Sequence, residues 1–396
     1  MIGDTLVLNA GSSSLKFQLL APESGEVTAH GIVERIGQPE GSARLDRDGG
    51  SLDWSGRVPD HAGALAAVQD LFHRAGIPLD GGQLRVVGHR VVHGGARFRR
   101  PVRIDAAVLQ AIRELSVLAP LHNPANAAVI EGALAAFGSV PQVAVFDTAF
   151  FATLPPAAAT YAIDRTVAEA NQVRRFGFHG ISHEYVSRRA AAALGRDPAE
   201  LDQIVLHLGN GASASAIRGG QAVDTSMGLT PMEGLVMGTR GGDLDPGVLL
   251  HLQRSARMGT DDVDRLLNRE SGIKGMAGVV DFRDLHRLIE QGDPDAALAL
   301  DVYCHRARKY IGAYLAVLGR ADTVVFTAGV GENDAIVRAR ITDGLAGLGI
   351  AVDPARNAAA ARGPRVISPD GSAVTVMVVP TNEELAIARQ ALALLG

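Results

Sequence analysis

The sequence is poor in several features, and each shortage excludes a class of protein. Cys304 is the only cysteine among 396 residues, so no disulfide can form within the chain. No apolar run approaches the ~18 residues that a membrane helix needs. The first four residues enter an apolar strand pattern without the basic segment of a secretory signal. We therefore expect a cytoplasmic protein that does not contact a membrane.

Familiar catalytic motifs are also missing. The chain has no Cys/His cluster, no H-E-x-x-H and no G-x-S-x-G, which gives a zinc site or a hydrolase elbow no support. Its glycine-rich segments lack the spacing of a P-loop and of a dinucleotide fingerprint. Lysine occurs only as Lys16, Lys274 and Lys309, because arginine supplies nearly all the positive charge.

The chain is rich in apolar residues and carries a small negative net charge. Hydrophobic residues make up 47% of the chain, enough for sizeable cores, and the length predicts two or three domains. The net charge of -5 disfavours a nucleic-acid partner. The one basic cluster, formed by Arg97, Arg99, Arg100 and Arg103, is typical of a solvated face.

Three apolar runs lead into polar, glycine-rich segments. The run 6–8 leads into residues 9–16 (N-A-G-S-S-S-L-K), and 17–20 is apolar again, which predicts strand, turn and strand. The freed backbone N–H groups, the serine hydroxyls and the Lys16 ammonium suit a phosphate, although a plain hairpin is the alternative. The runs 205–208 and 324–327 lead into 209–213 and 329–333 in the same way. Together the three segments favour several phosphate or nucleotide contacts.

Strand and helix patterns alternate along the chain, which predicts an α/β fold. Helices are expected at 61–75, 105–118, 126–137, 182–193, 246–258, 261–269 and 294–318, and strands at 86–88, 143–146, 204–208, 324–327 and 374–379. Residues 41–56 are interpreted as a hairpin or surface loop, and 153–156 as a domain junction. The strand–glycine turn–strand pattern near 6–20 recurs near 205–217, which indicates two similar halves.

Several single residues suit anion chemistry. Arg90 ends a buried strand before glycines, where its guanidinium can bind a carboxylate or phosphate, or can form an ion pair that ties strand to loop. His179, between glycines, is a candidate donor to a phosphoryl oxygen or else a packed histidine. His207 is at a strand end, a position typical of a packed core histidine. Arg240 lies in a long loop, a kind of loop that is usually functional or disordered.

The last strand is followed by T-N-E-E (381–384). A carboxylate at a strand end, here Glu383, suits Mg²⁺, which usually shares its coordination between protein, water and substrate phosphates.

Ten motifs, in order and spread over the whole chain, resemble the acetate kinase family. They are residues 9–16, G-H-R-V-V-H-G-G (88–95), A-P-L-H-N-P (119–124), F-D-T-A-F (146–150), F-G-F-H-G-I-S-H (176–183), H-L-G-N-G (207–211), D-T-S-M-G-L-T-P-M-E-G (224–234), M-G-T-R-G-G-D-L-D-P (237–246), G-V-G-E-N (329–333) and T-N-E-E (381–384). Phe176, Ile181 and Gly241 depart from the Tyr, Thr and Ser of many members.

The resemblance implies two ribonuclease H-like domains of the actin-like ATPase type, with a duplicated βββαβαβα core and a nucleotide cleft between them. Residues 1–150 with about 385–396 would form the substrate and phosphate domain, and 151–384 the nucleotide domain. It also implies a homodimer, Mg²⁺ (or Mn²⁺) as cofactor, and ATP/ADP with acetate/acetyl phosphate as substrates.

The resemblance also assigns roles to residues. The catalytic group would be Arg90, Asp147, His179 and Arg240, and the Mg²⁺ pair Asn9 and Glu383. The phosphate loops would hold Ser12, Ser14 and Lys16, and His207, Leu208, Gly209, Asn210 and Gly211. The adenosine would meet Asp281, Phe282, Arg283, Gly329, Val330, Gly331, Glu332 and Asn333. The acetate methyl would meet Val92, Leu121, Phe178 and Pro231, with Arg90 on its carboxylate.

The implied activity is reversible phosphoryl transfer from ATP to acetate. A propionate or butyrate kinase is the alternative among enzymes, because one methylene in an apolar pocket is worth only ~1–3 kcal/mol. A non-catalytic nucleotide-binding regulator is the alternative from another class, and the intact set of Arg90, Asp147, His179, Arg240 and Glu383 argues against it.

Overall fold

The structure is a computed structural model, and it describes residues 4–79 and 82–395. The chain divides into two compact units. The first unit comprises the chain up to Ala152 together with the segment from Asn382 onward, and the second runs from Thr153 to Thr381. The C-terminal segment therefore returns to the first unit at Asn382. Glu383 and Glu384 belong to the first unit, not to the end of the second as the sequence analysis expected.

The first unit is built on an eight-stranded sheet with the order β5-β4-β3-β2-β1-β6-β8-β7. Its strands are β1 (Asp4–Ala10), β2 (Ser14–Leu20), β3 (Val27–Glu34), β4 (Gly41–Arg47), β5 (Gly50–Gly56), β6 (Leu84–Val91), β7 (Val102–Arg103) and β8 (Gln142–Phe146). Strands β1 to β5 form an antiparallel meander, whereas β6 and β8 run parallel to β1. The hairpin expected over 41–56 is thus β4 and β5, inside the sheet.

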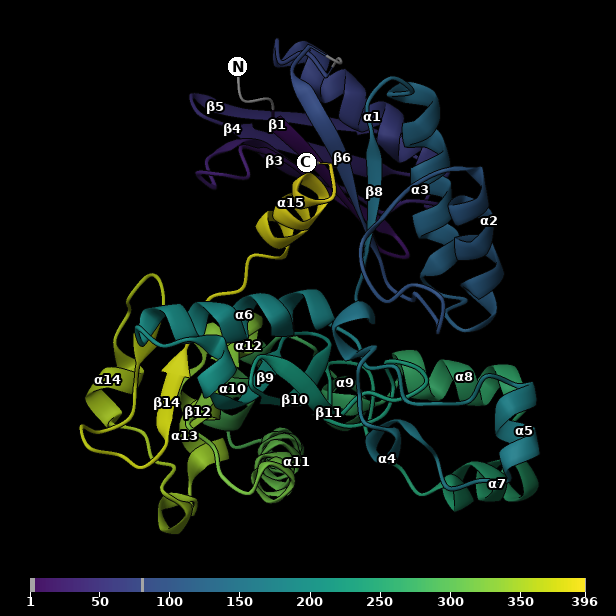
Figure 1. Cartoon of the computed structure of the whole chain (residues 1–396). Coiled ribbons are helices and arrows are strands. Elements are labelled where there is room, and N and C mark those ends of the chain that lie inside the picture. Colours follow the sequence, from purple (N-terminus) through teal and green to yellow (C-terminus); the bar gives the residue numbers. More distant parts are fainter. Residues whose placement is uncertain (1–3, 80–81, 396) are drawn as a thin grey trace. The chain divides into compact units, whose positions relative to one another are not determined.

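Helices cover both faces of this sheet. They are α1 (His61–Arg74), α2 (Ala106–Glu114), α3 (Asn123–Ala136) and α15 (Glu383–Ala393). Val87 of β6 belongs to the core that α1 and α3 complete, whereas a Cβ on the next residue, Gly88, would lie 2.8 Å from Ile387 of α15. Successive residues of a strand face opposite sides. Helix α15 therefore packs on the face opposite α1 and α3, and glycine at position 88 permits its close approach (Figure 1).

The second unit repeats the arrangement in a six-stranded sheet of order β11-β10-β9-β12-β14-β13. Its strands are β9 (Asp202–Leu208), β10 (Ala212–Arg218), β11 (Gln221–Thr225), β12 (Thr323–Thr327), β13 (Arg365–Val366) and β14 (Thr375–Val378). Strands β9 to β11 are antiparallel, and β12 and β14 run parallel to β9. The order β11-β10-β9-β12-β14 matches β3-β2-β1-β6-β8, which confirms the predicted duplicated core and the α/β class.

The second unit also contains a set of helices. They are α4 (Pro156–Ala159), α5 (Arg165–Ala170), α6 (Gly180–Ala193), α7 (Pro246–Ser255), α8 (Thr260–Arg269), α9 (Gly272–Ala277), α10 (Phe282–Glu290), α11 (Pro294–Leu318), α12 (Ala328–Asn333), α13 (Ala335–Thr342) and α14 (Pro354–Ala358). In the view of Figure 1, α6 lies above β9 and α11 below the sheet. No helix in the described part of the chain is long and apolar enough to cross a membrane.

The two halves exchange their last helices. Helix α6 follows β8 in the sequence but packs on β9 and β12, while α15 follows β14 but packs on β1, β6 and β8. This exchange is why the extreme C-terminal segment contributes Glu383 to the first unit.

One predicted turn is wrong in detail. Residues 329–333 lie in the short helix α12 instead of a glycine turn. The Glu332 carboxylate accepts the Ala328 N–H at 2.9 Å, and Ala328 itself has a left-handed φ of 65°. The Glu332 carboxylate, inside the helix, thus satisfies one N–H of the first turn where the glycines had indicated a loop.

Candidate active site

In the first unit, the ends of three neighbouring strands bring Asn9, Arg90 and Asp147 together. Asn9 and Arg90 are paired in the β1–β6 register, and Asp147 directly follows β8. Arg90 Nε and Nη2 donate to the two carboxylate oxygens of Asp147 at 3.1 and 2.6 Å, and Nη1 donates to Asn9 Oδ1 at 3.1 Å. The Asp147 side chain is 1% exposed and that of Arg90 20%. Arg90 thus forms an ion pair, which is one of its two interpretations. Part of its side chain also stays exposed, as the binding of a carboxylate or phosphate would require.

Glu383, the first residue of α15, adds a second carboxylate. Its Oε2 lies 3.8 Å from Arg90 Nε. Burial raises the pKa of Glu383 to about 7 against the lowering effect of Arg90, and Asp147 and Glu384 raise it further. Burial alone would lower the pKa of Arg90, but Asp147 and Glu383 more than offset this and raise it. The guanidinium therefore stays charged between two carboxylates.

The residues assigned to Mg²⁺ suit a partly hydrated ion. No group of three or more His, Cys, Asp or Glu side chains in the described ranges is placed to hold a metal. Asn9 and Glu383 offer one amide and one carboxylate oxygen, each close to the Arg90 guanidinium. Mg²⁺ prefers oxygen ligands and usually keeps several waters and substrate phosphates, so one or two protein ligands are sufficient.

The β1–β2 turn is held by side chains from two helices. Gly11 N–H donates to Ser14 O at 2.8 Å, and His61 Nε2 of α1 lies 2.8 Å from Gly11 O. Asn126 of α3 donates to Ala10 O at 3.0 Å. Ser12 is exposed on this fixed turn and Lys16 is exposed on the adjoining strand β2, as a phosphate contact requires. The sequence analysis missed Asn126, whose amide type in an otherwise apolar helix segment was the available signal.

The four residues assigned to the acetate methyl lie in different units. Val92 and Leu121 are in the first unit, and Phe178 and Pro231 are in the second. Val92 is 5% exposed, and its N–H donates to Asn126 Oδ1 at 3.1 Å. Strand β6 ends at Val91, so Val92 lies just beyond the strand that carries Arg90. Phe178 is buried and Leu121 and Pro231 are half-buried.

In the second unit, two histidine rings stack. His179 precedes α6 and His207 lies near the end of β9, with ring centroids 4.2 Å apart and planes at 22°. His207 Nδ1 is 2.8 Å from Ser182 Oγ, which lies 2.9 Å from Thr381 Oγ1. His179 has a left-handed φ of 58°, a conformation that costs a non-glycine residue energy and often marks a functional position. A Cβ on Gly211 would lie 3.2 Å from its Nε2, so that nitrogen faces the β9–β10 turn.

Arg240, in the second unit, is another candidate residue for binding an anion. Its Nη1 donates to Pro231 O at 3.1 Å, while its Nε is buried without a hydrogen-bond partner among the described residues. Burial lowers the pKa of Arg240, against the influence of Asp264. Buried donors are nearly always paired in native proteins, so an unpaired N–H on a guanidinium favours an anionic ligand.

The segments assigned to the nucleotide line one cavity of about 840 Å³ in the second unit. It is lined by Gly209, Asn210, Val280, Asp281, Phe282, Arg283, His286, Gly329, Val330, Asn333, Asp334, Ala335 and Ile336. His207, Leu208, Gly211, Gly331 and Glu332 are not among its lining residues. Glu332 instead accepts the N–H groups of Ala328 and Thr381 at 2.9 and 3.0 Å. The sequence analysis missed the apolar walls Val280 and Ile336, and the pair His286–Asp334 at 2.6 Å, since no motif marks them.

Comparison with known proteins fits this geometry. The model of a family described as the acetokinase family matches residues 4–389. The chain belongs to the acetokinase family.

Relatives within the acetokinase family align along their whole length. A protein of Leifsonia xyli subsp. xyli named acetate kinase is 57% identical over 98% of both chains. The crystal structure of Porphyromonas gingivalis acetate kinase has a TM-score of 0.94 at 40% identity and covers 100% of both chains. A propionate kinase of Francisella tularensis has a TM-score of 0.93 at 36% identity over 99% of both chains. The backbone of this acetokinase-family chain therefore resembles kinases named for two different carboxylates.

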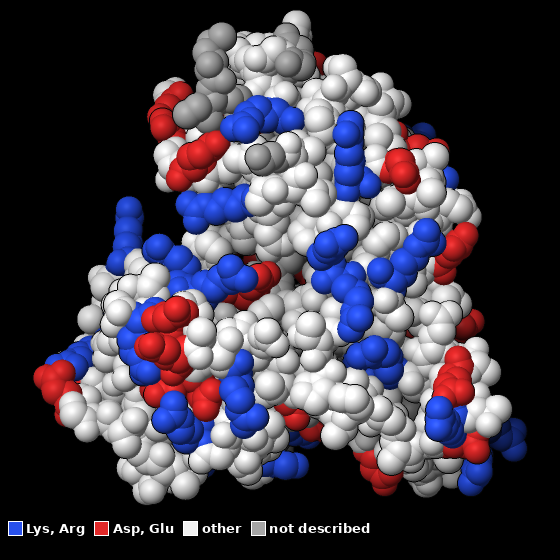
Figure 2. Space-filling model, viewed as in Figure 1, with Lys and Arg blue, Asp and Glu red and all other residues white. Residues whose placement is uncertain are grey.

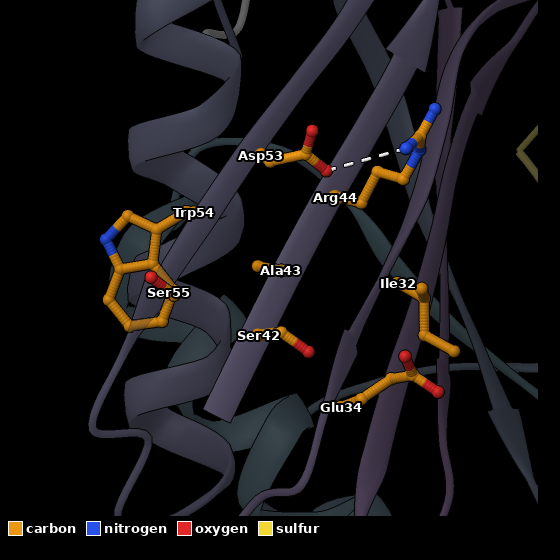
Figure 3. Close-up of a pocket in the computed structure, with 8 residues that line it drawn as sticks. All are labelled: Ile32, Glu34, Ser42, Ala43, Arg44, Asp53, Trp54 and Ser55. Atoms are coloured by element: carbon orange, nitrogen blue, oxygen red, sulfur yellow. Dashed lines mark ion pairs between the residues drawn. The ribbon is translucent and has the colours of Figure 1, made fainter. Parts of the chain in front are cut away.

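A separate hollow of about 390 Å³ lies on the β3–β4–β5 face and is lined by Ile32, Glu34, Ser42, Ala43, Arg44, Asp53, Trp54 and Ser55. Figure 3 shows Arg44 directed at Asp53, and the two form an ion pair at 3.6 Å. Figure 2 shows that acidic and basic side chains are interspersed over the side of the molecule that it presents. With its cation already paired, this hollow lacks the features that mark the strand-end site of this acetokinase-family chain.

Proposed function

We propose that this member of the acetokinase family transfers the γ-phosphoryl group of ATP to acetate, giving acetyl phosphate and ADP, and catalyses the reverse reaction. The observation that carries the proposal is Arg90, which is held by Asn9 and Asp147 at the ends of three strands. The relatives named acetate kinase support the same substrate. From the family resemblance we also propose a cytoplasmic homodimer that binds neither nucleic acid nor membrane.

The chemistry requires positioning more than proton transfer. A carboxylic acid with a pKa of about 4–5 is already ionised at pH 7, so the acceptor needs no strong base. A carboxylate oxygen forms a bond to the γ-phosphorus while the bond to the bridging oxygen breaks and ADP leaves. The difficulty is that an anion must approach a polyanion, so electrostatic stabilisation dominates.

Each proposed residue acts on that charge. Arg90 binds the acetate carboxylate, and Asp147 orients Arg90 through two parallel hydrogen bonds. His179 and Arg240 donate to the transferring phosphoryl oxygens, and Lys16 with Ser12 contacts the phosphates from the first glycine turn.

Asn9 and Glu383 are the residues we propose to hold Mg²⁺, with Mn²⁺ as the alternative. When bound, the ion offsets charge on the nucleotide phosphates.

Trapping of the product with hydroxylamine tests the proposal directly. Acyl phosphates react with hydroxylamine to give hydroxamates, whereas ATP hydrolysis gives none. We expect acetate-dependent ADP release with an equal amount of hydroxamate. ADP release without hydroxamate would indicate an ATPase, and nucleotide binding without any turnover would indicate a regulator.

Propionate kinase activity is the second candidate, since the Francisella tularensis structure named propionate kinase matches with a TM-score of 0.93. The same assay with acetate, propionate and butyrate distinguishes the candidates. We expect the highest kcat/KM with acetate.

Substitution Val92→Ala is expected to move preference toward propionate by one to two powers of ten in relative kcat/KM, because one methylene is worth ~1–3 kcal/mol in an apolar pocket. Val92 is buried just beyond the strand that carries Arg90. Steady-state kinetics with both acids measures the ratio, and Val129→Ala, in the core that α1 and α3 complete, is the control. An unchanged ratio would place Val92 away from the substrate.

Substitution Glu383→Ala is expected to raise the Mg²⁺ concentration for half-maximal activity by at least ~10-fold, since even indirect partners of a metal contribute that much. Nucleotide affinity without metal, measured by calorimetry, should stay near the parent value. Glu384→Ala is the matched control from the same helical turn and should do much less. If Glu383 only stabilises the start of α15, the variant loses ~0.3–1 kcal/mol of stability and titrates with Mg²⁺ like the parent.

A further inference from the structure

A chain of buried side chains reaches His179 from the second sheet. Ser215 Oγ on β10 lies 2.8 Å from His183 Nδ1 on α6. His183 Nε2 lies 2.8 Å from Ser213 Oγ, which is 2.9 Å from His179 Nδ1. Ser213, Ser215 and His183 are all fully buried. Ser213 and Ser215 face α6 together because residues two apart on a strand share a face.

The direction of these hydrogen bonds follows from the number of protons. Burial, together with the neighbouring His207, lowers the pKa of His183 well below its ordinary value. His183 is therefore neutral and carries one ring N–H, so it donates at one nitrogen and accepts at the other. Two directions of the chain remain: all donors point toward His179, or all point toward Ser215.

The hydrogen bond of Ser215 decides between the two directions of the chain. Within the described residues, the hydrogen-bond partner of its hydroxyl is His183 Nδ1. If His183 donated to Ser215, the hydroxyl hydrogen of Ser215 would be buried without an acceptor, which is costly. If Ser215 donates instead, His183 Nε2–H donates to Ser213 and the Ser213 hydroxyl donates to His179 Nδ1. The hydrogens of Ser215, His183 and Ser213 then all have acceptors.

We infer that Ser215, His183 and Ser213 are positioning residues that hold neutral His179 with its proton on Nε2, the nitrogen that faces the β9–β10 glycine turn. The inference rests on the proposed function, in which this N–H donates to a phosphoryl oxygen. In the opposite tautomer, Nε2 would present a lone pair to an anion, and the donor would be lost.

The orientation of His179 agrees with this role. Its Nε2 edge lies against Gly211, where even a methyl group would approach the ring to 3.2 Å. The ring also stacks on His207, which fixes its plane, and rotation that exchanged its two edges would break the hydrogen bond between Nδ1 and Ser213 Oγ. The tautomer thus has to be set by the partner of Nδ1, which is Ser213.

Nitrogen-15 NMR of the full-length protein with labelled histidine tests the inference without turnover. Ring ¹⁵N shifts distinguish a protonated from an unprotonated nitrogen, and a His179→Gln variant assigns the signals. We expect His179 to be protonated at Nε2 and unprotonated at Nδ1 near neutral pH. Protonation at Nδ1 in the parent, alone or with Nε2, would overturn the inference.

Substitution Ser213→Ala should then let His179 populate the other tautomer or take a second proton. We expect kcat to fall, up to the ~10²-fold loss that removal of one transition-state donor causes, while KM for acetate stays near the parent value. Ser215→Ala, which removes only the terminal donor, should shift the tautomer in the same direction to a smaller extent and provides a second variant if Ser213→Ala does not fold.

Ser187→Ala is the matched control, because Ser187 is equally buried on α6 but donates to Glu184 O outside the chain. It should leave the His179 signals and kcat as in the parent. Unchanged His179 signals in folded Ser213→Ala and Ser215→Ala would overturn the inference. A failure of the proposed function looks different: the Nε2 tautomer would be seen and respond to Ser213→Ala, but His179→Gln would keep full turnover.

Discussion

Removal of the Arg240 side chain is expected to lower kcat at least ~10²-fold, as the loss of one preorganised transition-state donor does, with little change in the melting temperature. The structure gives the reason for both halves of this result. Within the described ranges, the side chain of Arg240 makes one hydrogen bond, from Nη1 to Pro231 O, and its buried Nε has no partner. It therefore contributes little to the fold and is prepared to contact a developing charge. Hydroxamate formation gives kcat, and a thermal melt reports folding.

Two further variants complete this experiment. Arg240→Lys keeps the charge but not the planar donor fork, so it should recover only part of the lost rate. Arg254→Ala removes an exposed arginine from α7 and should behave like the parent. A folded Arg240→Ala protein with parental turnover would remove this residue from the site.

The sequence predicts the strand-end chemistry because that chemistry is local. Arg90 stands at the end of an apolar run, and parallel strands bring such ends to one edge of a sheet. What the sequence leaves open is the partner of Arg90. Asp147 lies 57 positions away, and only the pairing of β6 with β8 brings the two together. The two interpretations of Arg90 treat an ion pair and an anion-binding role as alternatives. In the structure the ion pair leaves part of the Arg90 side chain exposed, so the two roles are compatible.

Other features depend on tertiary contacts that no local pattern encodes. Strand β6 ends at Val91, because the N–H of Val92 donates to Asn126 Oδ1 and not to a neighbouring strand. The hydrogen-bonded chain to His179 exists only because α6, which follows β8 in the sequence, packs on β9 and β12 of the second sheet. Each of these features depends on a helix or a side chain from a distant part of the sequence, which hydrophobic periodicity and glycine content do not reveal.

Substitution Arg90→Ala is expected to have the largest combined effect. It leaves the Asp147 carboxylate, 1% exposed, without its bidentate partner. Loss of one member of a buried ion pair costs ~3–5 kcal/mol, so the melting temperature should fall clearly. Turnover should fall at least ~10²-fold at a temperature where the variant is folded, because the acetate carboxylate loses its cation. Thermal melts and hydroxamate formation measure the two effects.

The double variant Arg90→Met, Asp147→Asn separates a catalytic Arg90 from a merely structural one. Replacement of both charges of a buried pair is often close to neutral for stability. We therefore expect the double variant to recover most of the melting temperature lost in Arg90→Ala. Turnover should stay lost, because neither methionine nor asparagine restores a cation for the carboxylate. If turnover returned together with stability, Arg90 would serve only to tie β6 to the segment after β8, and another residue would have to bind the acceptor.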